Sequence, residues 1–412
     1  MPVYSPSRFL DYALLYGVIF TSGTILFNWS GSASLILGAL AGVTGLLFLR
    51  YVGRIDGHFL LYIFGLSAFL FCISIYTNES LPFSTIVSTD LRLIYAYMAL
   101  KLVGDRIFVS YLNVMVFLAA FSLFGFAADL SGISASLHPF LPHLSIATDE
   151  GFLYGFNFFQ HPTRNNSIFY EPGAYQFFLN AGIFMLLFAR VDLPPARRSS
   201  YLVILAITLI STISTTGLIM FAAIFVVAMF QKSSLSSRAK FVFLIGVSMV
   251  PLVFVSQMDY ALKKFDSYTG IRAIADKADL RPFDLLVDTA IIKENFFGLG
   301  ERRYHQRFSD IGLISETYSS SNGVTKLTAI FGVPFALFYF GTYAFFFVRF
   351  LPGWLLPGIC FSAFMVFLWS ESYYSFSPIC LTLIAAIFVF PRKRDSRNSV
   401  PSVKQTRPVN IS

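Results

Sequence analysis

The stretch HFLLYIFGLSAFLFCISIY, at residues 58–76, decides the class of fold. It carries no Lys, Arg, Asp or Glu, and its length suits one helical crossing of a hydrocarbon core that is about 30 Å thick. A backbone that crosses lipid must satisfy its own hydrogen bonds, so we expect an α-helix here. Working outward from this stretch, the sequence predicts a membrane-spanning helical bundle.

The rest of the chain has the same character. Of the 412 residues, 56% are hydrophobic, 13% are charged and 49 are phenylalanine, whereas about 25% of an ordinary soluble domain is charged. This composition excludes a soluble globular enzyme, a disordered protein and a coiled coil, and it predicts an all-α polytopic membrane protein. The net charge of +8 fits membrane topology better than nucleic-acid binding. Cys72, Cys360 and Cys380 lie in apolar runs, and their spacing fits neither a disulfide framework nor a metal site.

Apolar segments that approach the length of a membrane crossing occur twelve times. They lie near residues 10–29, 33–49, 58–76, 83–103, 108–128, 172–189, 200–213, 217–231, 240–257, 324–348, 353–369 and 373–391. The seventh and eighth are short, and a Ser/Thr cluster that ends in glycine separates them at residues 211–217. This pattern favours a tight turn between two short helices over one long tilted helix.

The basic residues set the orientation of these segments. Lys and Arg concentrate at the N-terminus, in alternate connections and in the tail, whereas connections 30–32, 77–82, 214–216 and 370–372 carry none. Because positive charge marks the cytoplasmic side, we expect both termini in the cytoplasm. Residues 1–391 are expected to form one membrane domain whose first helix is retained rather than cleaved. Residues 392–412 are expected to form a basic, disordered tail that touches anionic lipid.

Two predicted external loops are long, at about residues 129–171 and 259–322. They hold nearly all of the remaining basic residues, which suits either an anionic ligand or incidental charge on a solvated loop. In the second loop, apolar residues repeat at helical spacing between Pro282 and Gly298, which predicts an amphipathic helix on the membrane surface or on the bundle. The apolar positions are Phe283, Leu286, Val287, Ala290 and Ile291.

The first loop ends in the sequence RNNSIFYEPG, at residues 164–173. Pro172 suits the first position of a helix, which would make Glu171 a cap beside the positive helix end. An ionised carboxylate at the mouth of a membrane helix is costly without a partner, and Arg164 lies close enough in sequence to be one. The pattern favours a functional Glu171 over a simple cap.

The second loop contains the basic sequence ERRYHQR, at residues 301–307. Three arginines and a histidine so close together suit a pyrophosphate, because the arginine fork matches phosphate oxygens. A solvated basic stretch is an equal alternative. Near the outer end of the fourth segment, Asp90 and Arg92 either support a site or form a structural pair.

These motifs, in this order, resemble a known family. Arg164 with the FYEPG run at 169–173 resembles the Arg…Phe-x-Glu-Pro signature of Wzy-type polysaccharide polymerases, and the hairpin at 211–217 resembles their paired short helices. Arg281-Pro282 followed by NFFGLG at 295–300 resembles the Arg…Asn-Pro-x-Gly-x-Gly stretch of the wider O-antigen ligase and polymerase superfamily. The resemblance covers nearly the whole predicted topology.

Two positions depart from the superfamily pattern. Phe296 stands in place of the usual Pro, and Asn322-Gly323 stands where many members have His-Asn, with Ser321 in place of the His. The second departure favours a polymerase over a lipid A-core ligase.

The resemblance implies an enzyme of the bacterial inner membrane. Such polymerases transfer a growing glycan from undecaprenyl pyrophosphate onto a new lipid-linked repeat at the outer face, with no nucleotide sugar, metal or cofactor. The implied partners are the undecaprenyl-pyrophosphate-linked oligosaccharide, membrane lipid and a protein that regulates chain length.

Without a metal, cationic side chains must stabilise the leaving pyrophosphate, and a carboxylate or imidazole must align the acceptor hydroxyl. The candidate cationic residues are Arg164, Arg281, Arg302 and Arg303. Glu171 is the first candidate for the general base and His305 the second. The further substrate-binding candidates are Asn165, Asn322 and Arg92.

Two rival functions stay open. A ligase of the same superfamily would pass finished glycan to another acceptor. A transporter or flippase would place ionisable groups near the membrane midplane, whereas this sequence gathers them in external loops.

Overall fold

The structure is a computed structural model that describes residues 8–29, 32–77, 83–146, 149–159, 163–189, 191–230, 281–312, 320–370 and 376–390. Most of these residues are helical. The α-helices are α1 (Arg8–Phe20), α2 (Ile25–Trp29), α3 (Ala33–Tyr51), α4 (Gly57–Thr77), α5 (Phe83–Val103), α6 (Ile107–Leu130), α7 (Ile133–Leu137), α8 (Pro172–Phe188), α9 (Pro195–Ser211), α10 (Thr215–Phe230), α13 (Arg281–Glu294), α14 (Glu301–Gly312), α15 (Gly323–Phe331), α16 (Val333–Phe350), α17 (Leu355–Ser370) and α18 (Pro378–Val389). Two 3-10 helices are η1 (Gly104–Arg106) and η2 (His138–Phe140), and three strands are β1 (His143–Ile146), β2 (Asp149–Tyr154) and β3 (Asn157–Phe159).

Four helical segments are long and apolar enough to cross a membrane. They are Ala33–Tyr51, Gly57–Thr77, Ile86–Leu130 and Val333–Phe350. Large apolar side chains on their surfaces are exposed; Phe64 of α4, for example, is 71% exposed. Extended apolar surface of this kind is suited to lipid rather than water. The chain is therefore a predominantly helical membrane protein.

The helices follow the apolar segments of the sequence. In the described part of the chain, each predicted crossing coincides with one helix or a broken pair of helices. The predicted crossing at 240–257 and the tail at 392–412 lie outside the described residues. The total of twelve crossings stays a prediction.

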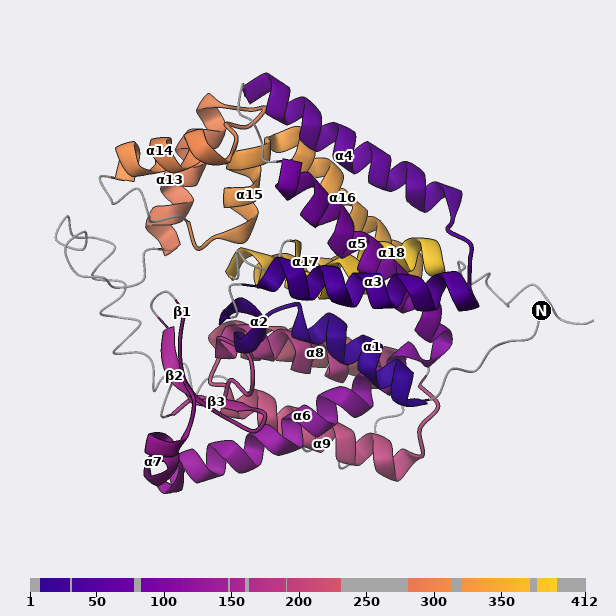
Figure 1. Cartoon of the computed structure of the whole chain (residues 1–412), viewed down its shortest axis with the longest axis vertical. Helices are drawn as coiled ribbons and strands as arrows, with labels where there is room; N and C mark the ends of the chain where they lie inside the picture. Colours follow the sequence, from indigo (N-terminus) through magenta and orange to yellow (C-terminus); the bar gives the residue numbers. More distant parts are fainter. Residues whose placement is uncertain are drawn as a thin grey trace, which may run out of the picture.

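The core is centred on α5, which packs against α3 and α18 (Figure 1). Tyr95 and Tyr97 of α5 are fully buried, and the ring of Tyr97 stacks on Phe59 of α4 with centroids 3.8 Å apart. The interior is thus built largely from aromatic side chains, which supply large apolar contact areas.

Two predicted crossings are interrupted helices. The first breaks between Phe20 and Ile25, where the hydroxyl of Thr21 donates back to the carbonyl of Gly17 at 2.9 Å. The tenth breaks at Gly332, whose φ of 87° ends α15 and opens α16. A continuous helix over each segment was the expectation, and the structure corrects it.

The first external loop contains a small antiparallel sheet of order β1-β2-β3. Phe152 of β2 pairs with His143 of β1 and with Phe159 of β3. The bundle is all-α, as expected, and this loop adds three short strands to it.

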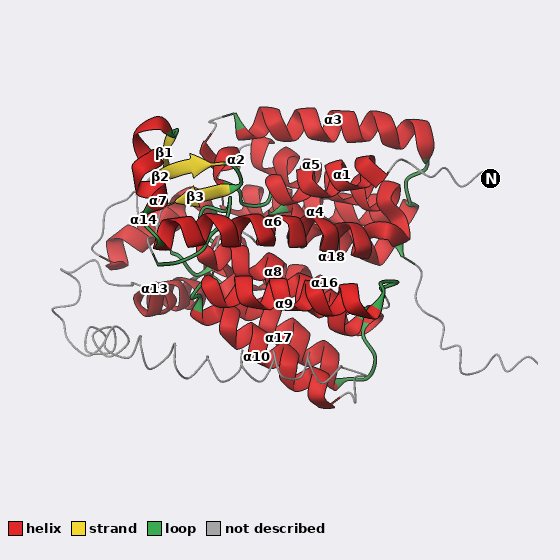
Figure 2. Ribbon diagram, turned by 90° about the horizontal axis from the view of Figure 1, so that it is seen from below, coloured by secondary structure: helices red, strands yellow, loops and turns green. Residues whose placement is uncertain are grey.

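The described parts of the two long loops lie at one end of the bundle. Figures 1 and 2 both show the sheet and helices α13 and α14 at the end opposite the N-terminus. Near that N-terminus, Arg106 binds the buried carboxylate of Asp11 through two hydrogen bonds of 2.7 and 3.1 Å. This pair ties α1 to the connection between α5 and α6.

Candidate functional site

The end of the first loop packs on the turn between α9 and α10. We call this arrangement the hairpin site: residues 164–171 together with the turn at 212–214. The guanidinium Nε of Arg164 donates to the backbone carbonyl of Thr212 at 3.3 Å, and the backbone N–H of Asn165 donates to the carbonyl of Ser211 at 2.9 Å. The half-buried Arg164 is therefore held at the mouth of a helical hairpin.

That hairpin is the one predicted from the Ser/Thr cluster. Helix α9 ends at Ser211 and α10 begins at Thr215. Ile213 adopts a φ of 47°, and the hydroxyl of Ser214 accepts a hydrogen bond of 3.3 Å from the N–H of Gly217. The prediction of two short helices is confirmed.

Asn165 lies in the protein interior, with only 3% of its surface exposed. Its Nδ2 donates to the hydroxyls of Ser122 and Ser211 at 3.1 and 3.0 Å, and its Oδ1 accepts from the N–H of Ser167 at 3.1 Å. Both amide hydrogens are used within the fold, so Asn165 supports the loop that carries Arg164.

Glu171 stands at the start of α8, as the sequence predicts. Pro172 occupies the first helical position, and the backbone carbonyl of Glu171 accepts from the N–H groups of Ala174 and Tyr175. Its carboxylate makes no capping hydrogen bond to the described first-turn amides of α8. The cap of α8 therefore rests on the backbone carbonyl of Glu171.

A buried polar pair continues along α8 below Glu171. Nδ2 of Asn180 donates to Oε1 of Gln176 at 3.0 Å and to the carbonyl of Gly217 at 3.1 Å. A Cβ on Gly217 would lie 2.7 Å from the Cβ of Gln176, so glycine is required where α10 meets α8. Sequence reasoning missed this pair, although Gln176 and Asn180 are spaced to share one helix face.

In the second loop, six residues join α13, α14 and the start of α15. We call Asp284, Asp288, Tyr304, Ser320, Ser321 and Thr325 the Asp288 cluster.

The carboxylate of Asp288 accepts three hydroxyl hydrogen bonds: 2.8 Å from Tyr304, 2.8 Å from Ser320 and 2.5 Å from Thr325. Asp284 accepts from the N–H and the hydroxyl of Ser321, both at 2.8 Å. Both carboxylates are fully buried. The pKa of Asp288 is raised, because burial disfavours the charged carboxylate. The three hydrogen bonds act in the opposite direction, but their effect is smaller.

The burial of these carboxylates corrects the predicted amphipathic helix. Helix α13 exists where it was expected, but its buried face combines Val287 and Ile291 with Asp284 and Asp288, whereas Leu286 is 70% exposed. The spacing of two aspartates at i and i+4 was the available signal for a polar cluster.

Asn322 caps α15: its Oδ1 accepts from the N–H of Thr325 at 3.4 Å. The side chain is 1% exposed, and its Nδ2 has no hydrogen-bond partner among the described residues. Asn322 also touches the Asp288 cluster, because its backbone N–H donates to the hydroxyl of Ser320 at 3.1 Å.

The remaining candidates of the second loop lie on α13 and α14. Arg302 and Arg303 are exposed, and the half-buried His305 lies beside Tyr304 with ring centroids 5.5 Å apart. Arg281 begins α13, but its side chain lies outside the described part.

The glycine-rich stretch after α13 supports the broken helix. The N–H groups of Leu299 and Gly300 donate to the carbonyls of Ala329 and Ile330 at 3.1 and 3.0 Å, and Phe296 accepts from Val333 at 2.9 Å. The backbone groups freed at Gly332 are thus satisfied by this stretch. The NFFGLG motif therefore stabilises the break between α15 and α16, which its sequence alone does not predict.

Arg92 and Asp90 of α5 bind different neighbours. Nη1 of Arg92 donates to the carbonyl of Phe376 at 3.5 Å, before α18, and Asp90 accepts from the hydroxyl of Ser67 in α4 at 2.6 Å. Each residue therefore ties α5 to a different helix.

Comparison with protein families, curated proteins and solved structures gives no match for this chain. The contacts join Arg164 and Asn165 to the α9–α10 turn, and Glu171 follows seven positions after Arg164, at the start of α8. The geometry brings Asn322 to the Asp288 cluster, with Arg302, Arg303 and His305 on the adjoining helix α14.

Proposed function

We propose that this protein is a polysaccharide polymerase of the bacterial inner membrane. It would transfer a growing glycan from a polyprenyl pyrophosphate onto a new lipid-linked repeat at the outer face. The observation that carries the proposal is the hairpin site: Arg164 is fixed on the α9–α10 turn, and the carboxylate of Glu171 stands at the mouth of α8. A cation and a carboxylate at a membrane mouth are the two groups that this reaction requires.

In this mechanism the oxygen of the acceptor hydroxyl bonds to the anomeric carbon of the donor sugar. Glu171 accepts the proton that this hydroxyl loses. The bond between that carbon and the pyrophosphate oxygen breaks, and the electron pair leaves with the pyrophosphate. Arg164 stabilises the developing charge, because the bond through Nε fixes the plane of the guanidinium, and a guanidinium matches phosphate oxygens. Arg302 and Arg303 add positive charge from the second loop.

The proposal includes the topology. Twelve crossings with both termini in the cytoplasm place the two long loops outside, which is supported by their position at one end of the bundle in Figures 1 and 2. A regulator of chain length is part of the proposal by resemblance alone.

A transporter is the second candidate, because two of the membrane helices are interrupted and transporters often bind cargo at such breaks. Here the backbone groups at the breaks bind protein. Ile25 donates to the carbonyl of Ile168 at 2.9 Å, and Leu299 donates to that of Ala329 at 3.1 Å. Because these backbone groups are already hydrogen-bonded to protein, the breaks favour an enzyme site over a site for transported cargo.

The direct test incubates the purified full-length protein with polyprenyl-pyrophosphate-linked repeats. A polymerase lengthens the lipid-linked glycan by whole repeats without any other acceptor. A ligase consumes the lipid-linked glycan only when a second acceptor is added, and a transporter leaves it unchanged.

A further inference from the structure

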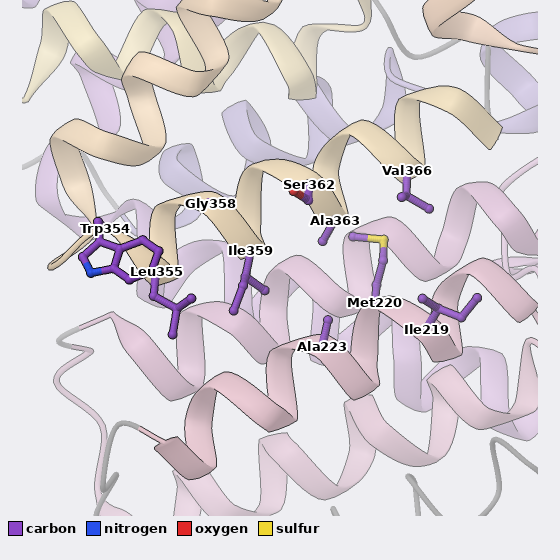
Figure 3. Close-up of a pocket in the computed structure, with 10 residues that line it drawn as sticks. All are labelled: Ile219, Met220, Ala223, Trp354, Leu355, Gly358, Ile359, Ser362, Ala363 and Val366. Carbon is purple, nitrogen blue, oxygen red and sulfur yellow. The ribbon is translucent and has the colours of Figure 1, made fainter.

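A groove of about 360 Å³ runs between α10 and α17. Figure 3 shows its residues: Met220 and Ala223 of α10 face Ile359 and Ala363 of α17. The lining side chains are apolar except for the hydroxyl of Ser362 and the indole N–H of Trp354. Water has little to bind there, so the groove is suited to a hydrocarbon chain.

Small residues give the groove its depth. A Cβ built on Gly358 would meet nothing within 4 Å, and Ala223 and Ala363 leave space on either side. A groove of this kind along two helices is suited to a flexible apolar chain.

The groove has two chemically different ends. At one end Ile219 lies one helical turn after Thr215, and therefore close to the hairpin turn that holds Arg164. At the other end Trp354 is 84% exposed, as expected for an indole at the interface of a membrane. The helical rise from Trp354 to Val366 corresponds to roughly 18 Å, which is a large part of the hydrocarbon core.

We propose that this groove holds the first part of the polyprenyl chain of the lipid-linked substrate, with the pyrophosphate at the outer end beside Arg164. This inference rests on the proposed function, because it assigns a place to that substrate. A single long apolar chain with an anionic head matches an apolar groove that ends at a fixed cation.

The test measures binding of undecaprenyl phosphate to the purified full-length protein by native mass spectrometry. Gly358→Phe fills the groove without a backbone clash, because the position is open. The matched control is Gly341→Phe on α16, where a Cβ also meets nothing within 4 Å. We expect wild type and Gly341→Phe to bind equally, and Gly358→Phe to bind about tenfold more weakly or worse, since part of the chain loses its apolar contact. Ala223→Phe, from the opposite wall, should give the same loss.

Three results would overturn the groove assignment: equal binding by Gly358→Phe and Gly341→Phe, no binding by wild type, or equal competition by phosphatidylglycerol, which would mark a site for bulk lipid. The assignment and the proposed function fail separately. If binding depends on the groove but no glycan is elongated, the groove assignment stands and the proposed polymerase function fails. If wild type elongates glycan, and Gly358→Phe and Gly341→Phe bind undecaprenyl phosphate equally, the proposed function stands and only the groove assignment fails.

Discussion

Arg164 and Thr212 are joined by a hydrogen bond of 3.3 Å between the guanidinium Nε and the backbone carbonyl. The turn that supplies this carbonyl is itself fixed, because the hydroxyl of Thr212 donates to the carbonyl of Leu209 at 2.7 Å. The position of the arginine therefore depends on the hairpin between the short helices α9 and α10. This relationship explains why a loop residue and a Ser/Thr turn forty-eight positions later belong to one site.

We predict that Arg164→Lys lowers glycan elongation by about 100-fold while the protein still folds, because an ammonium loses the Nε bond and cannot offer a planar fork to the leaving group. Elongation is measured with the purified protein and lipid-linked repeats. Arg197→Lys is the control: Arg197 is exposed, its Nε donates to the hydroxyl of Tyr201 at 2.8 Å, and it lies at the other end of α9 from the turn, so activity should be unchanged. A fully active Arg164→Lys would refute the phosphate contact.

We predict that Glu171→Gln leaves folding intact and lowers elongation by roughly 100-fold or more, the usual contribution of a general base. Folding is preserved because the cap of α8 uses the backbone carbonyl of Glu171, which glutamine retains. Glu294→Gln, at an exposed carboxylate of α13, serves as the control. If glycan lengths in cells are unchanged by Glu171→Gln, the base is another group, and His305 is the next to test.

We predict that Asp288 makes stability fall as pH rises above the ordinary carboxyl range. Its pKa is raised by burial, so the folded state holds a proton that the unfolded state has lost, and the free energy of unfolding declines through that window. Asp288→Asn removes this titration. Between about pH 4 and pH 7, the apparent melting temperature should therefore fall by a few degrees less in the variant than in wild type.

The control for this measurement is Asp310→Asn, at an exposed carboxylate of α14, which should keep the wild-type pH slope. The comparison uses slopes rather than absolute stabilities, because Asn also changes three hydrogen bonds. Parallel curves for wild type and Asp288→Asn would show that the buried carboxyl does not titrate in this window.

We predict that Gly298→Ala destabilises the protein by about 2 kcal/mol or more, from a strained backbone and overpacking together. Gly298 has a φ of 90°, and a Cβ there would lie 2.5 Å from the carbonyl oxygen of Ile330. Gly341→Ala, in an open position of α16, should instead be neutral or stabilising by about 0.5–1 kcal/mol. Thermal unfolding in detergent distinguishes them, and equal midpoints would contradict the tight packing of this stretch on the broken helix.

Local features of the sequence were sufficient for much of the fold. The positions of the helices follow from apolar segment length, and the α9–α10 hairpin follows from the Ser/Thr cluster that ends at Gly217. Pro172 at the first position of α8 was likewise readable, because proline favours that position regardless of the rest of the fold.

Features that depend on distant partners were not predictable. The breaks near Thr21 and at Gly332 persist because residues far along the chain satisfy their backbone groups, as Ile168 does for Ile25. The Asp288 cluster assembles hydroxyls from two other parts of the second loop and from α15. Hydropathy therefore placed Val287 and Ile291 correctly in the buried face of α13, but it missed the buried Asp284 and Asp288. The hydrogen bonds of the Asn165 amide to Ser122 and Ser211 likewise join residues that are far apart in the sequence.

The most direct test of the central proposal is a gel of surface and lipid-linked glycans from a deletion strain complemented with wild type or with Arg164→Ala. We predict single repeats in the deletion strain, a ladder restored by wild type, and no ladder with Arg164→Ala. Long chains that accumulate on the polyprenyl pyrophosphate in the deletion strain would instead identify a ligase. An unchanged ladder, in a strain that has no redundant polymerase, would contradict both readings and favour the transporter.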